Sequence, residues 1–267
     1  MSTDALGPES DVRMSLTEHL AELRTRLIRA LGATAVGFGV AYFWAAELVT
    51  FLLRPLRDQG LDVEVIGTGV TDAFFIKLKV AAIAGIFVAS PVIFFQAWRF
   101  VSPGLYTREK RVALPFSIAA TAFFVAGAAF CYELVFPVAF RFFLEQFQSI
   151  ALGPQIRISE YLTFASRMLL AFGVTFELPV ASFFLARVGL ITHRTLLDSA
   201  RYAIVVIFVV AAVLTPGPDV ASQMLMAAPL LVLYAMSIGV AYMVARPAVV
   251  EATEDLPAAD DGAASSQ

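Results

Sequence analysis

The sequence predicts an all-α integral membrane protein with six transmembrane helices. Of its 267 residues, 59% are hydrophobic and only 15% are charged, whereas a soluble domain carries about 25% charged residues. Five long windows contain no Lys, Arg, Asp or Glu, and a sixth window contains a single acid. Because a charge near the bilayer centre costs roughly 2.5–3.5 kcal/mol, these windows mark the segments that cross the membrane.

The predicted spans lie within one membrane domain, residues 15–246. In chain order they cover about 28–47, 76–98, 112–136, 162–186, 202–214 and 221–244. A flexible segment, 1–14, is expected before this domain. A disordered acidic tail, 247–267, is expected after it, because the tail is rich in Ala, Asp, Glu and Ser and has little to bury.

The fifth predicted span is too short to cross an ordinary bilayer. Its 13 residues rise only about 20 Å, against a hydrocarbon core of roughly 30 Å. The segment Thr215-Pro216-Gly217-Pro218-Asp219 then forms a turn, because two prolines and a glycine cannot continue a helix. The bilayer is therefore expected to be locally thinned here, or the helix ends covered by protein.

Charge distribution predicts the orientation of the chain. An even number of spans places both termini on one side of the membrane. Twelve of the 19 Lys and Arg residues fall on that side and seven on the other. The positive-inside rule therefore places both termini in the cytoplasm.

Several kinds of chemistry are excluded by what the sequence lacks. A lone cysteine, Cys131, cannot form an internal disulfide, and two histidines fall short of a metal cluster. No nucleophile and base occur in a catalytic motif, and no glycine-rich phosphate loop follows a strand. The net charge of −3 does not suit a nucleic-acid binder. We expect no enzyme activity, no cofactor and no metal.

The first candidate site is an acid on an amphipathic helix before the first span. Ser15-Leu16-Thr17-Glu18 forms a capping box, so a helix is predicted to begin there. Glu22 is followed by Arg26 at i,i+4, and the two side chains can simply form a surface ion pair. Alternatively, the carboxylate of Glu22 is presented to a cationic ligand.

The second candidate acid lies in the first loop on the cytoplasmic side. Glu109 stands among Arg108, Lys110 and Arg111, where it can balance charge at the start of the third span. Taken with Glu22, it forms the second of two carboxylates on the same face of the membrane. Carboxylates bind guanidinium groups through two parallel hydrogen bonds, so a peptide with paired arginines would fit both acids.

The sixth window contains an ionisable group inside the membrane. Glu177 occurs in Phe172-Gly173-Val174-Thr175-Phe176-Glu177-Leu178-Pro179 and is flanked by nine uncharged residues on each side. An intramembrane acid suggests a functional site, while a structural hydrogen bond to a neighbouring helix is the alternative. Ser222 and Gln223 add polar groups at the start of the last span, where they can bond to a partner helix.

Four patches in order make the chain resemble the twin-arginine translocase TatC family. The patches are His19-Leu20-Ala21-Glu22-Leu23-Arg24; Ser90-Pro91-Val92-Ile93 with Phe100, Pro103, Leu105 and Glu109; the segment around Glu177; and the turn to Asp219 with Ser222-Gln223. The resemblance covers residues 15–246. It implies a concave, glove-like bundle with short fifth and sixth spans in the bacterial cytoplasmic (inner) membrane.

The resemblance also implies a function and assigns residues to it. It implies a receptor that binds twin-arginine signal peptides and exports folded proteins with TatA- and TatB-type single-span partners, using the proton motive force. Self-association in a multimeric complex is implied as well. The signal-binding residues fall on Glu22, Arg24, Phe100 and Glu109, and the intramembrane and partner-contacting residues fall on Glu177, Thr215 and Gln223. Asp219 falls in the periplasmic turn.

Two other functions remain open from the residues alone. A proton- or cation-coupled transporter of small solutes would use Glu177 as its ion site, but it needs convergent polar groups around an internal cavity. A structural membrane scaffold would tolerate the loss of Glu177. The sequence offers one intramembrane acid and no internal repeat, which favours the receptor over the transporter.

Overall fold

The computed structural model describes residues 16–58, 63–101, 113–149, 153–215 and 220–244, and it confirms an all-α membrane fold. Four helical spans are long and apolar enough to cross a bilayer, namely Asp72–Phe100, Ala113–Phe147, Ile158–Arg187 and Val220–Val244. A bent helix pair at the N-terminus and the shorter apolar helix α8 (Ala200–Leu214) supply the first and fifth predicted spans.

The first predicted span is a long helix followed by a sharp bend. Helix α1 (Leu16–Phe43) begins ahead of the apolar window, and α2 (Ala45–Arg57) follows it at an angle of 80°. Residues 44–47 were therefore expected to continue a straight span and instead form the bend and the start of α2. Ala41, Ala45 and Ala81 form a small buried cluster there, and their short side chains allow the bend to pack closely on α3.

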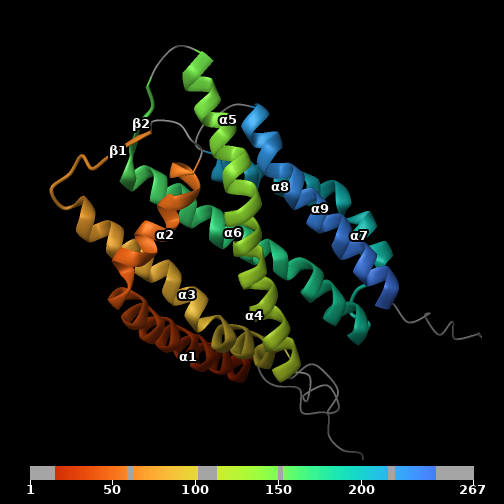
Figure 1. Cartoon of the computed structure of the whole chain (residues 1–267). Helices are drawn as coiled ribbons and strands as arrows, with labels where there is room; N and C mark the ends of the chain where they lie inside the picture. Colours follow the sequence, from red (N-terminus) through yellow and green to blue (C-terminus); the bar gives the residue numbers. More distant parts are fainter. Residues whose placement is uncertain (1–15, 59–62, 102–112, 150–152, 216–219, 245–267) are drawn as a thin grey trace, which may run out of the picture.

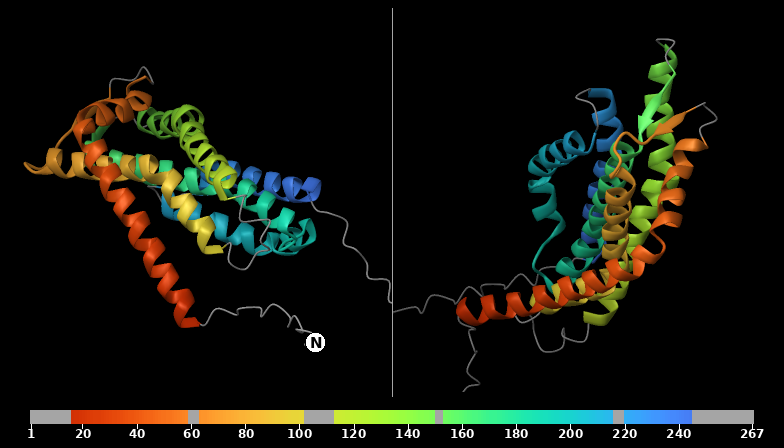
Figure 2. Two further views of the ribbon diagram at one scale, coloured as in Figure 1. Left: turned by 90° about the horizontal axis from the view of Figure 1, so that it is seen from below. Right: turned by 90° about the vertical axis from the view of Figure 1, so that its left-hand side faces the viewer.

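The helices form one curved layer rather than a closed bundle (Figures 1 and 2). Helix α1 packs on α3 (Asp72–Val101), α3 on α4 (Ala113–Phe130), α4 on α6 (Ile158–Val188), and α6 on α9 (Val220–Val244). Helix α8 then packs on α9. Thus α1 forms one edge of the layer, and α8 with α9 forms the opposite edge.

Glycines allow two of these neighbouring helix pairs to approach closely. A Cβ atom on Gly37 of α1 would lie 2.5 Å from the carbonyl oxygen of Gly85 on α3. A Cβ on Gly127 of α4 would lie 2.6 Å from the carbonyl oxygen of Phe172 on α6. Small residues at helix contacts are typical of membrane proteins, where tight packing replaces the hydrophobic effect as the force between helices.

Tyrosine hydroxyls attach α2 to the rest of the layer. Pro55 lacks an N–H group, so it cannot bond the carbonyl of Phe51 one turn earlier. The hydroxyl of Tyr132 donates to that carbonyl over 2.8 Å, and Tyr161 donates to the carbonyl of Leu52 over 2.6 Å. Tyr132 lies in a π-helical turn, Cys131–Val135, that joins α4 to α5 (Phe136–Ser149).

A second intrahelical proline is compensated in the same way. Pro91 in α3 leaves the carbonyl of Phe87 without its usual donor. The hydroxyl of Ser90 donates to that carbonyl over 2.7 Å, and Ser117 of α4 donates to the carbonyl of Pro91 over 2.7 Å. Because no water is available in the bilayer core, each carbonyl freed by a proline needs a protein donor.

Two short strands, which no pattern in the sequence predicted, lie beside α2. Strands β1 (Glu64–Ile66) and β2 (Gln155–Arg157) pair in parallel, with Val65 opposite Ile156. They lie at the end of the molecule that carries α2, which we call the α2 end (Figure 1). Three residues per strand give too weak a hydrophobic pattern to be recognised in the sequence.

Of the two spans expected to be short, only the fifth is. Helix α8 has 15 residues, whereas α9 has 25 and is long enough to cross a bilayer. The expectation of a short sixth span came from the family resemblance, while the charge-free window itself runs from Asp219 to Arg246. Between α6 and α8 lies a further short helix, α7 (His193–Asp198), which begins with a Thr192 capping box.

Candidate functional site

Glu22 and Arg26 form an ion pair on α1. The Nε atom of Arg26 donates to Oε1 of Glu22 over 2.9 Å, and its Nη2 atom contacts the same oxygen. Both side chains are largely covered, with 13% of Arg26 and 20% of Glu22 exposed. The other carboxylate oxygen, Oε2, is buried and has no partner among the described residues. The expected i,i+4 pair is therefore present, and one oxygen of the carboxylate accepts no hydrogen bond from the described residues.

The start of α1 lies against the end of α3. The ring of His19 stacks on that of Phe100, with centroids 4.5 Å apart. Phe100 thus lies one helical turn from Glu22 along the surface of α1. Arg24 is exposed on α1, two residues from Glu22, and side chains at i and i+2 on a helix point in different directions. The structure therefore brings Phe100 close to Glu22, whereas the side chain of Arg24 points away from Glu22.

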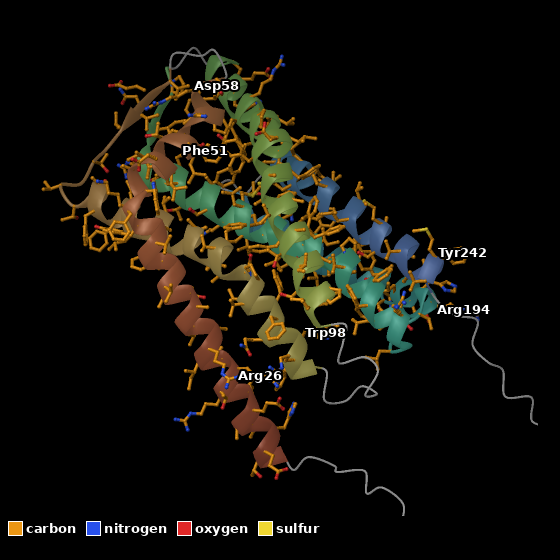
Figure 3. The ribbon with its side chains drawn as sticks, turned by 60° about the horizontal axis from the view of Figure 1, so that its bottom comes forward. Arg26, Phe51, Asp58, Trp98, Arg194 and Tyr242 are labelled. Atoms are coloured by element: carbon orange, nitrogen blue, oxygen red, sulfur yellow. The ribbon has the colours of Figure 1, made fainter. Side chains whose placement is uncertain are left out.

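Several of the residues singled out in the sequence lie outside the described part of the chain, among them Glu109, Asp219 and Ser15. Glu109 falls on the connection between Val101 and Ala113, and Asp219 falls just before α9. Ser15, the predicted cap, immediately precedes the first residue of α1. Arg26 and Trp98 mark the region around the start of α1 and the end of α3, far from Asp58 at the α2 end (Figure 3).

Glu177 lies in the middle of α6, two residues before Pro179. Its Oε1 atom is buried and has no hydrogen-bond partner among the described residues. The structural hydrogen bond to a neighbouring helix, which the sequence left open, is therefore absent from this part of the chain. A carboxyl group placed without a partner inside a membrane protein is a candidate for interaction with another chain.

The two polar residues near the α8–α9 connection are internally bonded. Thr215 is buried, and its hydroxyl donates to the carbonyl of Ala211 over 2.6 Å. The amide of Gln223 donates to the carbonyl of Phe208 over 2.9 Å, which ties α9 to α8. Both residues lie at the α8 edge of the layer, where the resemblance places the contact with partner helices.

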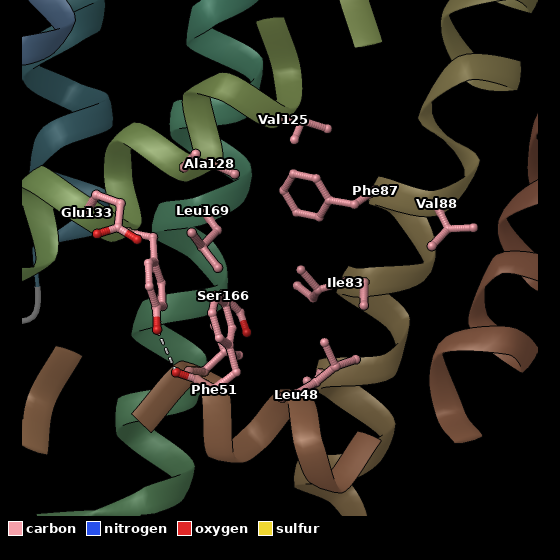
Figure 4. Close-up of a pocket in the computed structure, with 15 residues that line it drawn as sticks. Leu48, Phe51, Ile83, Phe87, Val88, Val125, Ala128, Glu133, Ser166 and Leu169 are labelled. Atoms are coloured by element: carbon pink, nitrogen blue, oxygen red, sulfur yellow. Dashed lines mark hydrogen bonds between the residues drawn. The ribbon is translucent and has the colours of Figure 1, made fainter. Parts of the chain in front are cut away.

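An apolar pocket of about 430 Å³ lies between α2, α3, α4 and α6 (Figure 4). Most of its lining is aliphatic or aromatic, and the polar groups come from Tyr132, Glu133 and Ser166. The Tyr132 hydroxyl is bonded to Phe51, while the buried hydroxyl of Ser166 has no partner among the described residues. Such a pocket suits an apolar chain. Glu177 is not among its lining residues.

Sequence reasoning missed the residues that hold this region together. No periodic pattern in the sequence marks Tyr132 or Tyr161. Their role depends on hydrogen bonds to α2, whose acceptors lie 81 and 109 residues earlier in the chain. The usable signal was Pro55, because a proline inside a helix implies that some donor meets the freed carbonyl. Within the described residues no group of three or more His, Cys, Asp or Glu side chains is placed to hold a metal ion.

These features define a multi-pass α-helical membrane protein with polar sites at its helix ends and inside one span. The family model described as Sec-independent protein translocase protein (TatC) matches residues 18–229. The chain therefore belongs to the TatC family, whose members are non-enzymatic components of a protein translocase.

Individual relatives are similar over most of their length. The TatC protein of Desulforapulum autotrophicum is 47% identical over 223 residues, which cover 83% of this chain and 82% of that protein. The TatC protein of Carboxydothermus hydrogenoformans is 43% identical and covers 86% and 94%. A crystal structure of the twin-arginine translocase receptor TatC matches with a TM-score of 0.79 and 37% identity, over 86% of this chain and all of that one.

Proposed function

We propose that this chain is the receptor subunit of a twin-arginine translocation system. In this proposal Glu22 and Glu109 bind the consecutive arginines of signal peptides, with Arg24 and Phe100 in the same binding surface. Membership in the TatC family supports the assignment of the chain to a protein translocase. The observation that carries the arginine site is the Glu22 carboxylate, which keeps one buried oxygen without a partner among the described residues.

The chemistry of this carboxylate favours an arginine ligand. A guanidinium group can take both oxygens of a carboxylate at once, so an incoming arginine would replace or join Arg26. The stacked pair His19–Phe100 lies beside Glu22. Planar rings next to a carboxylate suit a planar guanidinium better than the point charge of lysine.

The remaining assignments concern partners and energy. We propose that Glu177, Thr215 and Gln223 contact the single-span TatA- and TatB-type partners, that Asp219 belongs to the turn on the periplasmic side, and that the receptor self-associates. Export of folded proteins is driven by the proton motive force, in the bacterial inner membrane with both termini cytoplasmic. Residues 15–246 form the membrane domain, between the segment 1–14 and the tail 247–267.

Peptide binding to the purified full chain tests the proposal. A fluorescent signal peptide with Arg-Arg or Lys-Lys is titrated against the unmodified chain and against Glu22→Ala and Glu109→Ala. We expect binding that prefers Arg-Arg and weakens about tenfold or more in each variant, because each removes a charge-assisted bidentate contact. Glu145→Ala is the matched control, since it removes another i,i+4 Arg–Glu pair, with Arg141, on the surface.

Three results would contradict the receptor assignment. Equal binding of the two peptides, abolished by moderate salt, would make the acids general surface charge. Equal losses in Glu145→Ala and Glu22→Ala would show that the effect does not depend on the site. Unfolding of Glu22→Ala, measured by its thermal midpoint, would assign Glu22 a structural role instead.

A further inference from the structure

A polar pocket of about 420 Å³ lies between α3, α6 and the end of α8, on the side of these helices nearer the α2 end. Two cations line it, Lys79 and Arg167, and the lining also includes the hydroxyl residues Ser159, Thr163 and Thr215. Glu160 is the one acid among the lining residues. It lies beside Arg157, whose Nη1 atom is 3.4 Å from its carboxylate. The pocket therefore carries a net positive charge.

Lys79 is held by one hydrogen bond, and both cations have donors that no described residue uses. The ammonium of Lys79 donates to the hydroxyl of Thr163 over 2.6 Å, and Thr163 donates in turn to the carbonyl of Ser159 over 2.6 Å. Lys79 thus has two further N–H groups to give. Arg167 is exposed and forms no ion pair with any acid in the described ranges. Its guanidinium carries five N–H donors, and none of them has an acceptor among the described residues.

The pocket opens on an apolar outer face of the protein that suits contact with lipid. Val213, which lines it, is 68% exposed, and Val209, one turn earlier on α8, is 58% exposed. Helix α8 is mostly aliphatic. Exposed valines on such a helix face acyl chains rather than water. Two cations therefore lie at a bilayer-facing opening.

Helix lengths indicate how deep this opening lies. The spans of α3 and α6 have 29 and 30 residues, about 45 Å, so a centred span extends about 7 Å beyond each side of a roughly 30 Å hydrocarbon core. Lys79 lies about 10 Å along α3 and Arg167 about 13 Å along α6. Their backbones therefore lie about 3–6 Å inside the hydrocarbon boundary.

The length of α8 places the pocket at a similar depth in the bilayer, counted from the opposite side of the membrane. Its 15 residues rise about 22 Å, so a helix that starts at the inner boundary stops about 8 Å short of the outer one. Val213, Leu214 and Thr215 at its end line the pocket. Because α8 ends below the outer boundary, it leaves space beside its end. This space lies at the depth of Lys79 and Arg167, whose charges need a partner or water there.

We propose that this pocket binds the phosphate of an anionic phospholipid headgroup from the leaflet at the α2 end. Lys79 and Arg167 hold the phosphate oxygens, while the acyl chains lie along the exposed valines of α8. Arginine and lysine are the usual ligands of phosphate, and a lipid phosphate at this depth would also account for a thinned bilayer beside a short helix. The site is separate from the proposed signal-peptide site, since Lys79 lies near the start of α3 and Phe100 near its end.

Binding of a tail-labelled phosphatidylglycerol to the purified full chain in neutral detergent tests the site. The unmodified chain is expected to bind phosphatidylglycerol about tenfold more tightly than phosphatidylcholine, because the pocket is positively charged. Lys79→Gln and Arg167→Gln are each expected to weaken binding of phosphatidylglycerol about tenfold, the effect of one charge-assisted contact. Lys77→Gln is the matched control, because it removes the same charge from an exposed lysine on α3 that lines a different pocket.

Two further comparisons in the binding experiment distinguish a lipid ligand from free phosphate, and a phosphate site from cations that are only hydrated. Free glycerol phosphate in large excess is expected not to displace the lipid; displacement at concentrations similar to those of the lipid would mean that the pocket takes free phosphate. Equal losses in Lys77→Gln and Lys79→Gln, or equal affinity for the two lipids, would overturn the proposal and reduce the two cations to side chains that extend to water.

A last variant tests whether the charges themselves hold the phosphate. Thr163→Val keeps both cations and removes the hydroxyl that positions Lys79. It is expected to weaken binding of phosphatidylglycerol less than either charge removal does. A greater loss would overturn the assignment of the phosphate to the cations.

Discussion

At the residue scale, the most unusual group is the carboxyl of Glu177. It lies in the middle of a membrane-spanning helix, and its buried oxygen has no partner among the described residues. Groups of this kind are costly to keep without a partner, so natural chains retain them for a function or for contact with another molecule. The apolar pocket is lined by a single acid, Glu133, by no basic residue and not by Glu177, which does not support the transporter alternative.

Glu177→Gln therefore tests the role of this carboxyl. We expect the thermal unfolding midpoint of the purified variant to be no lower than that of the unmodified chain, because the substitution removes an ionisable group without removing a hydrogen bond to the described residues. Assembly with single-span partners, measured by co-purification, is expected to fall. A lowered midpoint would indicate a structural bond to the side chain, and normal export with normal assembly would favour the scaffold.

The hydroxyl of Tyr132 is a second group with a specific expected effect. Tyr132→Phe is expected to lower the free energy of unfolding by about 0.5–1.5 kcal/mol, because the carbonyl of Phe51 loses its donor. In a Pro55→Ala background the cost should be smaller, since the introduced alanine supplies its own N–H to that carbonyl. Chemical unfolding of the unmodified chain, the two single variants and the double variant measures this coupling.

Tyr42→Phe is the control for this cycle. Tyr42 is 40% exposed, and its hydroxyl has no hydrogen-bond partner in the described residues, so its removal is expected to have little effect. If Tyr132→Phe costs as much in the Pro55→Ala background as it does with Pro55 in place, the hydroxyl does not act through the freed carbonyl.

At the element scale, the layer depends on close contacts between pairs of helices. The Gly37–Gly85 contact joins α1 to α3, and the Gly127 and Gly173 contacts join α4 to α6. These contacts are with backbone atoms or aromatic rings, which cannot move aside as the end of a flexible side chain can. A single methyl group at such a position therefore separates two helices.

Gly37→Ala is expected to destabilise the fold by about 1–3 kcal/mol, the usual cost of overpacking. Gly39→Ala is the matched control on the same helix, because no atom lies within 4 Å of a Cβ at that position. Alanine is about 1 kcal/mol better than glycine inside a helix, so Gly39→Ala should be neutral or stabilising. Thermal unfolding of both variants in one detergent checks the difference, and equal midpoints would show that α1 and α3 do not meet at Gly37.

At the scale of the whole molecule, the two ends of the helical layer are expected to face opposite sides of the membrane. Asp58 lies at the α2 end and Arg194 at the far end of the layer (Figure 3). Both residues are exposed, whereas Cys131, the lone cysteine, is fully buried. Cysteine labelling can therefore report on each end without background from the natural thiol.

We expect Asp58→Cys to react with a membrane-impermeant thiol reagent in intact spheroplasts. Arg194→Cys should react only after the membrane is permeabilised, because the positive-inside rule places the α7 region in the cytoplasm. The unmodified chain serves as the control and should stay unlabelled. The reverse pattern would invert the topology, and labelling of both variants in intact spheroplasts would contradict a membrane between the two ends.

The sequence predicted most of the fold because lipid imposes a strong constraint on composition. The windows with at most one charge overlap the long apolar spans of α3, α4, α6 and α9. The bend after Phe43 and the two strands were not predicted, since they depend on the alanine cluster between α1, α2 and α3 and on pairing across about 90 residues. For the candidate site, the Glu22–Arg26 pair followed from helical spacing. The stacking of His19 on Phe100 did not, because it joins two helices.

By itself, then, the sequence determined that this is a multi-span α-helical membrane protein, and its motifs predicted the family to which it belongs. Both follow from local properties, since charge is excluded from hydrocarbon whatever the fold and a motif is read along one segment. The tertiary structure alone decided which polar groups meet. Lys79 and Arg167 share a pocket with the end of α8, and Glu177 has no partner among the described residues, because side chains far apart in the sequence become neighbours only when the helices pack.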